Sequence, residues 1–246
     1  GGVGRRCGGV VAVAAVDLDG RPGERRAILG PNGAGKTTLF NLVSGEFPPT
    51  SGTVELFGAD VTGTRARIRA RMGLSRTFQT SRLFGGLSVE DNLYLAVLGV
   101  RGGHLRLVRT ARDAEMVEEA RAMAEVVGLA PKLPTLVAEL SHGEQRQLEV
   151  GMARVAQPKL MMLDEPAAGL SRAERVQLTE RLRALDPAIT LILIEHDMDV
   201  ALRVAEWVTM MHDGRVIVEG TPDEIRANET VHELYLGGSI HAEETG

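Results

Sequence analysis

Short runs rich in aliphatic residues predict β-strands in the outer parts of the chain. They comprise residues 10–18, 25–29, 160–163 and 190–194. The last two runs are continuously apolar, which is typical of strands buried on both faces of a parallel sheet. A helical pattern over residues 171–185 separates them, so strands alternate with helices in this part of the chain.

From about residue 85 the pattern changes to helical spacing. Ser88 followed by Asp91 is typical of a helix start, and it opens the largely apolar segment 88–98. Segment 111–128 also predicts a helix, with Gly128 at its end. We expect the stripe of this helix to pack in a core rather than to bind a ligand. The stripe consists of Met116, Ala120, Met123 and Val127.

Two segments combine strand character with a polar turn. Residues 52–61 have strand character with a turn at residues 58–60, and residues 208–220 predict a hairpin that turns at residues 213–214. A capping segment, Thr221–Glu224, then predicts one more helix.

These elements predict an α/β fold in which a mostly parallel sheet carries an antiparallel β part and an inserted helical subdomain. We expect one domain over residues 1–246. Its core lobe should comprise residues 1–84 and 159–246, and its helical subdomain residues 85–158.

The segment Gly30–Thr38, GPNGAGKTT, matches the phosphate-loop pattern G-x-x-x-x-G-K-[ST] at every fixed position. It lies between a predicted strand and a predicted helix, which is the context of a phosphate-loop NTPase. Lys36 is expected to reach the β- and γ-phosphates, and the Thr37 hydroxyl to bind Mg²⁺. The residues expected to contact the nucleotide are Asn32, Gly33, Ala34, Gly35, Lys36, Thr37 and Thr38.

Composition limits the remaining function classes. The net charge of −5 gives no general attraction to nucleic acid, so no nucleic-acid partner is expected. Cys7 is the only cysteine, which excludes an internal disulfide and fits a reducing cytosol. No apolar run has the length of a membrane span, and the start of the chain, GGVGRRCGG, has no hydrophobic stretch of signal-peptide length. We therefore expect another chain to hold this protein at any membrane where it acts.

Two adjacent carboxylates end the predicted strand in LMMLDEP, residues 160–166. Asp164 is expected to hold Mg²⁺ through water, as a phosphate-loop ATPase requires. Glu165 is then expected to orient or deprotonate the attacking water.

The hexapeptide LSHGEQ, residues 140–145, resembles the signature motif of ATP-binding-cassette (ABC) ATPases. The resemblance implies that Ser141 and Gly143, with Glu144 beside them, contact the γ-phosphate of an ATP held by a second protomer. Ser141 followed by Glu144 is also a plain capping box, and both interpretations can hold together. His142 and Glu144 depart from the commoner LSGGQ.

Two more residues fit the same family. Gln79 in RTFQ resembles the glutamine that senses Mg²⁺ and the attacking water. His196 in LIEHD resembles the switch histidine that bonds the γ-phosphate.

Further segments resemble the ATPase subunits of branched-chain (hydrophobic) amino-acid importers. They are FNLVSG, RTFQ, RLF, PAAGLS, EHD and the ending GTPDEIRANETVHELYLGG. The resemblance implies an ATPase on the cytoplasmic side of the inner membrane. Its partners would be permease subunits, a second ATPase subunit in a homo- or heterodimer, and, indirectly, a periplasmic solute-binding protein. Importers of urea and short amides share much of the pattern, and a DNA-repair or chromosome ATPase is the alternative from another class.

Three features depart from these relatives. Cys7 stands where the family usually has an aromatic residue that stacks on adenine, and Ser171 stands where many cassettes have an aspartate. The first residues also lack the apolar strand that usually opens such domains, so we expect an altered or shortened start.

Overall fold

A central six-stranded sheet organises the chain. The computed structural model describes residues 2–7, 10–77, 83–101 and 111–233. The strand order is β10-β9-β3-β8-β7-β6, and every neighbouring pair is parallel except β9 and β10. The strands are β3 (Arg25–Leu29), β6 (Leu74–Arg76), β7 (Leu160–Asp164), β8 (Thr190–Ile194), β9 (Trp207–His212) and β10 (Arg215–Gly220). The predicted α/β fold class is confirmed.

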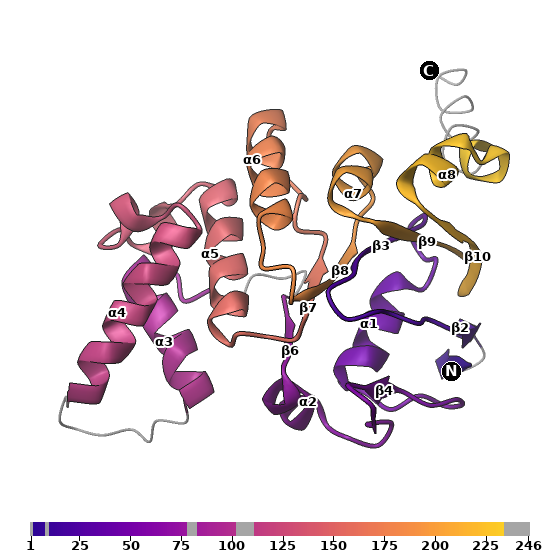
Figure 1. The fold of residues 1–246 in the computed structure, drawn as a ribbon, viewed down its shortest axis with the longest axis horizontal. Coiled ribbons are helices and arrows are strands. Elements are labelled where there is room, and N and C mark those ends of the chain that lie inside the picture. The colour runs from indigo at the N-terminus through magenta and orange to yellow at the C-terminus, as the bar shows by residue number, and fades with distance from the viewer. Residues whose placement is uncertain (1, 8–9, 78–82, 102–110, 234–246) are drawn as a thin grey trace.

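Side-chain alternation along the central strands builds a core on each face of the sheet. In β7, Met161 and Leu163 join one cluster, while Leu160 and Met162 join the other. The first face is covered by α6 (Arg172–Arg183), α7 (Met198–Val204) and α8 (Pro222–Ala227), and the second by α1 (Lys36–Ser44) and α2 (Ala66–Met72) (Figure 1). Burial on both faces explains why the sequence of β7 is continuously apolar.

Three helices form a separate bundle beside the β6 edge of the sheet (Figure 1). They are α3 (Val89–Arg101), α4 (Ala111–Val126) and α5 (His142–Val155), and two short 3₁₀ turns at Ala130–Lys132 and Val137–Glu139 precede α5. The bundle has its own core, which contains Met116, Ala120 and Val127 from the predicted stripe. The proposed division into residues 1–84 with 159–246 and residues 85–158 remains a prediction.

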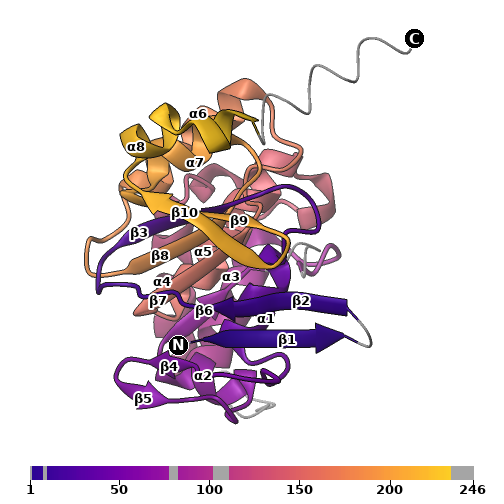
Figure 2. The same ribbon diagram turned by 90° about the vertical axis from the view of Figure 1, so that its right-hand side faces the viewer.

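The start of the chain forms a strand that sequence analysis did not expect. β1 (Val3–Cys7) pairs antiparallel with β2 (Val10–Val16), beside the main sheet (Figure 2). The sequence of this strand, VGRRC, is largely polar, so it is not the apolar strand that usually opens such domains. Val3 is buried opposite Val16, and Gly4 forms a β-bridge with Ser51, so pairing with distant residues compensates for the polar sequence.

The turn predicted at residues 58–60 lies slightly earlier. β4 (Glu55–Leu56) and β5 (Ala59–Asp60) form a two-stranded pair around Phe57 and Gly58, whose φ angles are 54° and 77°. Two consecutive left-handed residues are typical of a tight hairpin, and Gly58 adopts this conformation without strain. The hairpin predicted at residues 213–214 is confirmed between β9 and β10.

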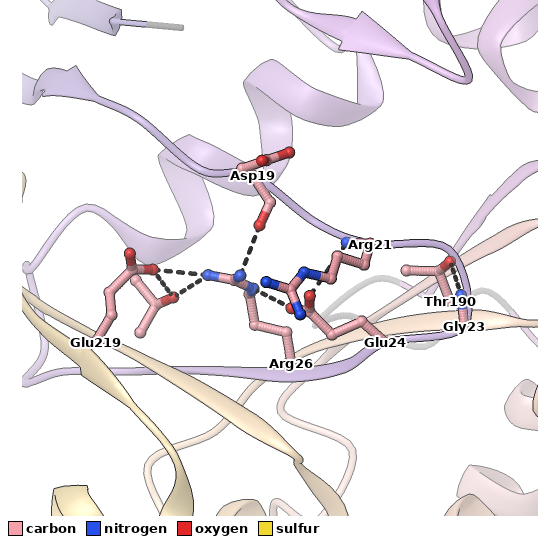
Figure 3. A network of polar contacts seen from close by, with 8 residues as sticks. Asp19, Arg21, Gly23, Glu24, Arg26, Thr190 and Glu219 are labelled. Atoms are coloured by element: carbon pink, nitrogen blue, oxygen red, sulfur yellow. Dashed lines mark hydrogen bonds and ion pairs between the residues drawn. The ribbon is translucent and has the colours of Figure 1, made fainter.

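A buried arginine joins strands of the main sheet at the amino end of β3, away from the phosphate loop (Figure 3). The Arg26 guanidinium donates to Glu24 Oε1 (2.6 Å), Thr209 Oγ1 (2.8 Å), Glu219 Oε1 (2.7 Å) and the Asp19 carbonyl (2.6 Å). Because each donor group meets an acceptor, the charge of this buried side chain is compensated within the fold.

Candidate functional site

The phosphate loop connects β3 to α1 at the carboxyl edge of the parallel strands, where ligands of open α/β sheets bind. Gly33 and Gly35 have φ angles of 84° and 95°, which favour glycine. A Cβ atom on Gly35 would also collide with the Ala12 carbonyl oxygen, whereas one on Gly33 would meet no atom within 4 Å. The loop therefore needs glycine at Gly35 for both conformation and space.

Lys36 opens α1 and is 5% exposed. Its Nζ donates to the carbonyl oxygens of Gly30 (2.6 Å) and Pro31 (3.0 Å), so the ammonium lies under the curve of the loop. Burial lowers the pKa of Lys36, and the negative charges of Glu165 and Asp164 oppose that change. A buried ammonium group that hydrogen-bonds carbonyl oxygens of the phosphate loop is suited to bind a phosphate oxygen.

Asp164 ends β7 and is 1% exposed. Its Oδ2 lies 3.3 Å from Arg76 Nη2, while Oδ1 has no hydrogen-bond partner among the described residues. Burial raises the pKa of Asp164, and the Arg76 guanidinium opposes the rise. A buried carboxylate oxygen without a donor is costly, and a hydrated cation would remove that cost.

Mg²⁺ fits this donor set only together with a nucleotide. Thr37, the other proposed ligand, is exposed in the first turn of α1. Within the described ranges no group of three His, Cys, Asp or Glu side chains could hold a metal ion alone. The oxygens of Thr37 and Asp164 would therefore need to be completed by phosphate oxygens and water. Gln79, the third proposed ligand, lies outside the described residues.

Glu165 follows β7 with a φ angle of 48°, which is uncommon for a residue with a side chain. Its backbone N–H donates to the Ile194 carbonyl at 2.9 Å. His196, which follows β8, places Nδ1 3.8 Å from Glu165 Oε2. The two neighbouring strands thus bring the proposed water-activating carboxylate and the proposed switch histidine together at one sheet edge.

The signature segment caps α5. Ser141 Oγ accepts from the Glu144 N–H at 3.2 Å, and Glu144 Oε2 accepts from the Ser141 N–H at 2.9 Å, so the capping box is confirmed. Lys132 Nζ lies 3.3 Å from the other Glu144 oxygen. This pairing occupies the Glu144 carboxylate with its own helix start.

The start of α5 lies beside a carboxylate of the same chain. Glu174, in the first turn of α6, lies against Gly143, so that a Cβ atom on Gly143 would collide with Glu174 Oε1. Hydrogen bonds from Ser171, and more weakly from Gly143, lower the pKa of Glu174. A negatively charged group of the same chain thus already lies beside the start of α5, where the helix dipole favours an anion such as a γ-phosphate.

Sequence reasoning missed Arg76, which connects three parts of the site. Its guanidinium donates to Asn41 Oδ1 (2.6 Å) and Ser44 Oγ (2.7 Å) in α1, and also meets Asp164. The three-residue strand β6, LSR, has too short a sequence pattern to be predicted, so no local signal pointed to Arg76. Cys7 belongs to β1, but its side chain lies outside the described part of the structure.

Comparisons with known proteins show which family the chain belongs to. A family model described as "ABC transporter" matches residues 13–168, and one described as "Branched-chain amino acid ATP-binding cassette transporter" matches residues 215–241. The chain is 38% identical to the high-affinity branched-chain amino acid transport ATP-binding protein LivG of Salmonella typhimurium, over 94% of each chain. It is 35% identical to BraF of Pseudomonas aeruginosa, a protein with the same description, over 96% of each chain.

Solved structures show the same fold. The ADP conformation of MJ1267, an ATP-binding cassette of an ABC transporter, superposes with a TM-score of 0.85 and 27% identity over 96% of both chains. A nucleotide-free ATP-binding cassette from an ABC transporter superposes with a TM-score of 0.83 and the same identity. With a family match over more than half of its length, this chain belongs to the ATP-binding cassette family of ABC transporter ATPases.

Proposed function

We propose that this ATPase binds ATP with Mg²⁺ at the carboxyl edge of β3 and β7 and hydrolyses it to ADP and phosphate. The observation that carries the proposal is a buried ammonium and a buried carboxylate that attract each other: Lys36 in its loop, and Asp164 with one oxygen that bonds to none of the described residues. Lys36 would exchange its carbonyl partners for phosphate oxygens. Asp164 and Thr37, with Gln79, would hold the ion, which neutralises charge on the phosphates when bound.

Glu165 and His196 would act on the water and on the γ-phosphate. Glu165 orients the water and accepts its proton, and the imidazole of His196 hydrogen-bonds the γ-phosphate that the water attacks, with ADP as the leaving group. Their 3.8 Å separation supports this division, because the attacking water and the γ-phosphate whose phosphorus it attacks must also be neighbours.

The complete site would need a second ATPase subunit. Ser141 and Gly143 would contact an ATP bound to the partner's phosphate loop, in a head-to-tail dimer. The Glu174 carboxylate, which already lies beside Gly143, supports an anion-binding role for this helix start. The Gly143–Glu174 contact would have to open before a phosphate could enter.

We further propose uptake of branched-chain or other hydrophobic amino acids, at the cytoplasmic side of the inner membrane. The names of the relatives and the family match at residues 215–241 support this cargo. None of the described helices is long and apolar enough to cross a bilayer. Permease subunits would therefore bind the ATPase at the membrane, and a solute-binding protein would deliver the cargo.

The ATPase proposal is tested by phosphate release from the purified chain with ATP and Mg²⁺. Lys36→Ala should abolish hydrolysis, and Lys159→Ala is the matched control because Lys159 is exposed. If Lys159→Ala lost hydrolysis and Lys36→Ala kept it, the assignment of Lys36 to phosphate binding would be contradicted. For the cargo, proteoliposomes with the cognate permeases, second ATPase and binding protein should take up leucine but not urea. Urea uptake without leucine uptake would reject the amino-acid proposal.

A further inference from the structure

Glu195 is a fully buried carboxyl group at the centre of the site that the motifs do not explain. It follows β8 directly, between Ile194 and His196, and its exposed fraction is 0%. Glu195 Oε1 accepts the backbone N–H of Ala167 at 2.8 Å, and Oε2 forms no hydrogen bond with any described residue. An acidic side chain is rarely buried to this extent unless its oxygens form hydrogen bonds or pair with a charge.

The acceptor lies beneath the segment that follows Glu165. This segment, residues 166–171, connects β7 to α6. Glu165 itself has the left-handed φ of 48°, and such a conformation persists only when neighbouring contacts hold it. Two hydrogen bonds hold this segment, and their acceptors are consecutive residues. The Ile194 carbonyl accepts the Glu165 N–H, and the Glu195 side chain accepts the Ala167 N–H.

Glu195 also affects the position of His196, the second residue proposed to act in hydrolysis. His196 is the next residue in the chain, so the buried Glu195 side chain anchors the backbone that carries the imidazole. A single carboxyl group thus joins the segment after β7 to the segment after β8. Movement of one segment would be transmitted to the other through the bond between Glu195 and Ala167.

We propose that Glu195 is a positioning residue for ATP hydrolysis, which holds Glu165 and His196 in register through its hydrogen bond to the Ala167 N–H. The inference rests on the roles proposed above for those two residues. Glu195 touches no reacting atom in this scheme. Its contribution is the geometry of the water-activating pair, which affects the rate of the chemical step more than the affinity for ATP.

The chemistry requires an acceptor at this position and does not require a charge. Burial raises the pKa of Glu195 to about 7, against the opposing effect of the N–H groups of Ala167, Asp197 and His196. Both the neutral and the ionised carboxyl can accept the Ala167 N–H. A glutamine side chain has the same length and still offers an oxygen that accepts the Ala167 N–H. A leucine side chain has a similar volume but no acceptor. An aspartate side chain has an acceptor but is one methylene too short to reach the Ala167 N–H.

The test compares kcat, KM and ATP affinity for the full chain and its Glu195→Gln, Glu195→Leu and Glu195→Asp variants. We expect Glu195→Gln to stay within about threefold of the parent kcat, and the other two to lose at least tenfold with ATP affinity unchanged within about twofold. Leu193→Ala is the matched control, because it removes buried volume from the same strand and leaves the bond to Ala167 in place.

Each outcome decides between positioning and simple packing. A Glu195→Gln variant as impaired as Glu195→Leu, or a Leu193→Ala variant with an equal loss of kcat, would overturn the inference. If Glu195→Leu does not fold, the pair Glu195→Gln and Glu195→Asp decides, since equal kcat in both would also overturn it. A parent chain without ATPase activity would instead reject the proposed function, so the two failures are distinguishable.

Discussion

The buried Glu195 carboxyl should make the stability of this protein depend on pH between about 4.5 and 7. Its pKa is about 7 in the folded chain against an ordinary value of 4.5. Between these values the folded state binds the proton and the unfolded state has released it. Stability therefore falls as pH rises through this window, and the full loss is present above about pH 7.

The size of this loss follows from the two pKa values. At about 1.4 kcal/mol for each pH unit between them, the ionisation of Glu195 destabilises the fold by about 3 kcal/mol at pH 8. At pH 5 most of that cost is absent. Glu195→Gln cannot ionise and retains the acceptor for Ala167, so its stability should lack this component. Between pH 5 and pH 8 the parent should lose about 2–3 kcal/mol more than the variant.

Urea unfolding of the nucleotide-free chain at pH 5, 6, 7 and 8 measures the difference, with the single Trp207 as the fluorescent probe. Glu229→Gln is the matched control, because it removes one exposed carboxylate and should leave the pH profile parallel to that of the parent. The reasoning would be refuted if the difference between Glu195→Gln and the parent were constant across the four pH values.

Three further predictions concern the nucleotide site. Glu165→Gln should keep ATP binding and lower turnover by about 10²–10⁴, and it should accumulate as an ATP-bound dimer in size-exclusion chromatography; near-normal turnover would remove Glu165 from its role. Lys36→Ala should lose nucleotide binding, whereas Ser141→Arg should bind ATP without dimerising. Mixing these two inactive variants should restore partial activity, and no recovery in demonstrated mixed dimers would count against the head-to-tail dimer. Cys7→Tyr should tighten ATP binding about 5–100-fold in calorimetry by supplying a stacking partner for adenine, and equal affinities would show that Cys7 costs nothing.

The sequence predicted best those features whose cause lies within a few neighbouring residues. The phosphate loop follows from glycines at fixed spacing, and the capping boxes of α5 and α8 follow from Ser or Thr three residues before Glu. Strands β7 and β8 were found because burial on both faces leaves a continuous apolar run. The short elements β1, β6, α2 and α7 were missed, because their apolar residues show neither the spacing of a helix nor the alternation of a strand clearly enough.

Arg69 shows what local patterns cannot predict. A charged residue in a helix is normally exposed, but Arg69 in α2 is 0% exposed. It donates to the carbonyl oxygens of Leu42 (2.7 Å) and Val43 (2.7 Å) near the end of α1. It also donates to the carbonyl oxygen of Val61 (2.6 Å), directly after β5. The last carbonyls of a helix need partners, and here a second helix provides one. That requirement becomes visible only when α1 and α2 lie side by side.

The sequence by itself determined the ligand class, the family and most of the individual strands and helices, because each depends on contiguous residues. Only the tertiary structure decided which side chains share the site. The parallel strands bring Arg76 to Asp164 across 88 residues, and Ala167 to Glu195 across 28. The sheet order that causes these meetings depends on burial and hydrogen bonding summed over the whole core. No single segment of the chain contains that information, so a buried acceptor such as Glu195 looks like any other glutamate until the strands are in place.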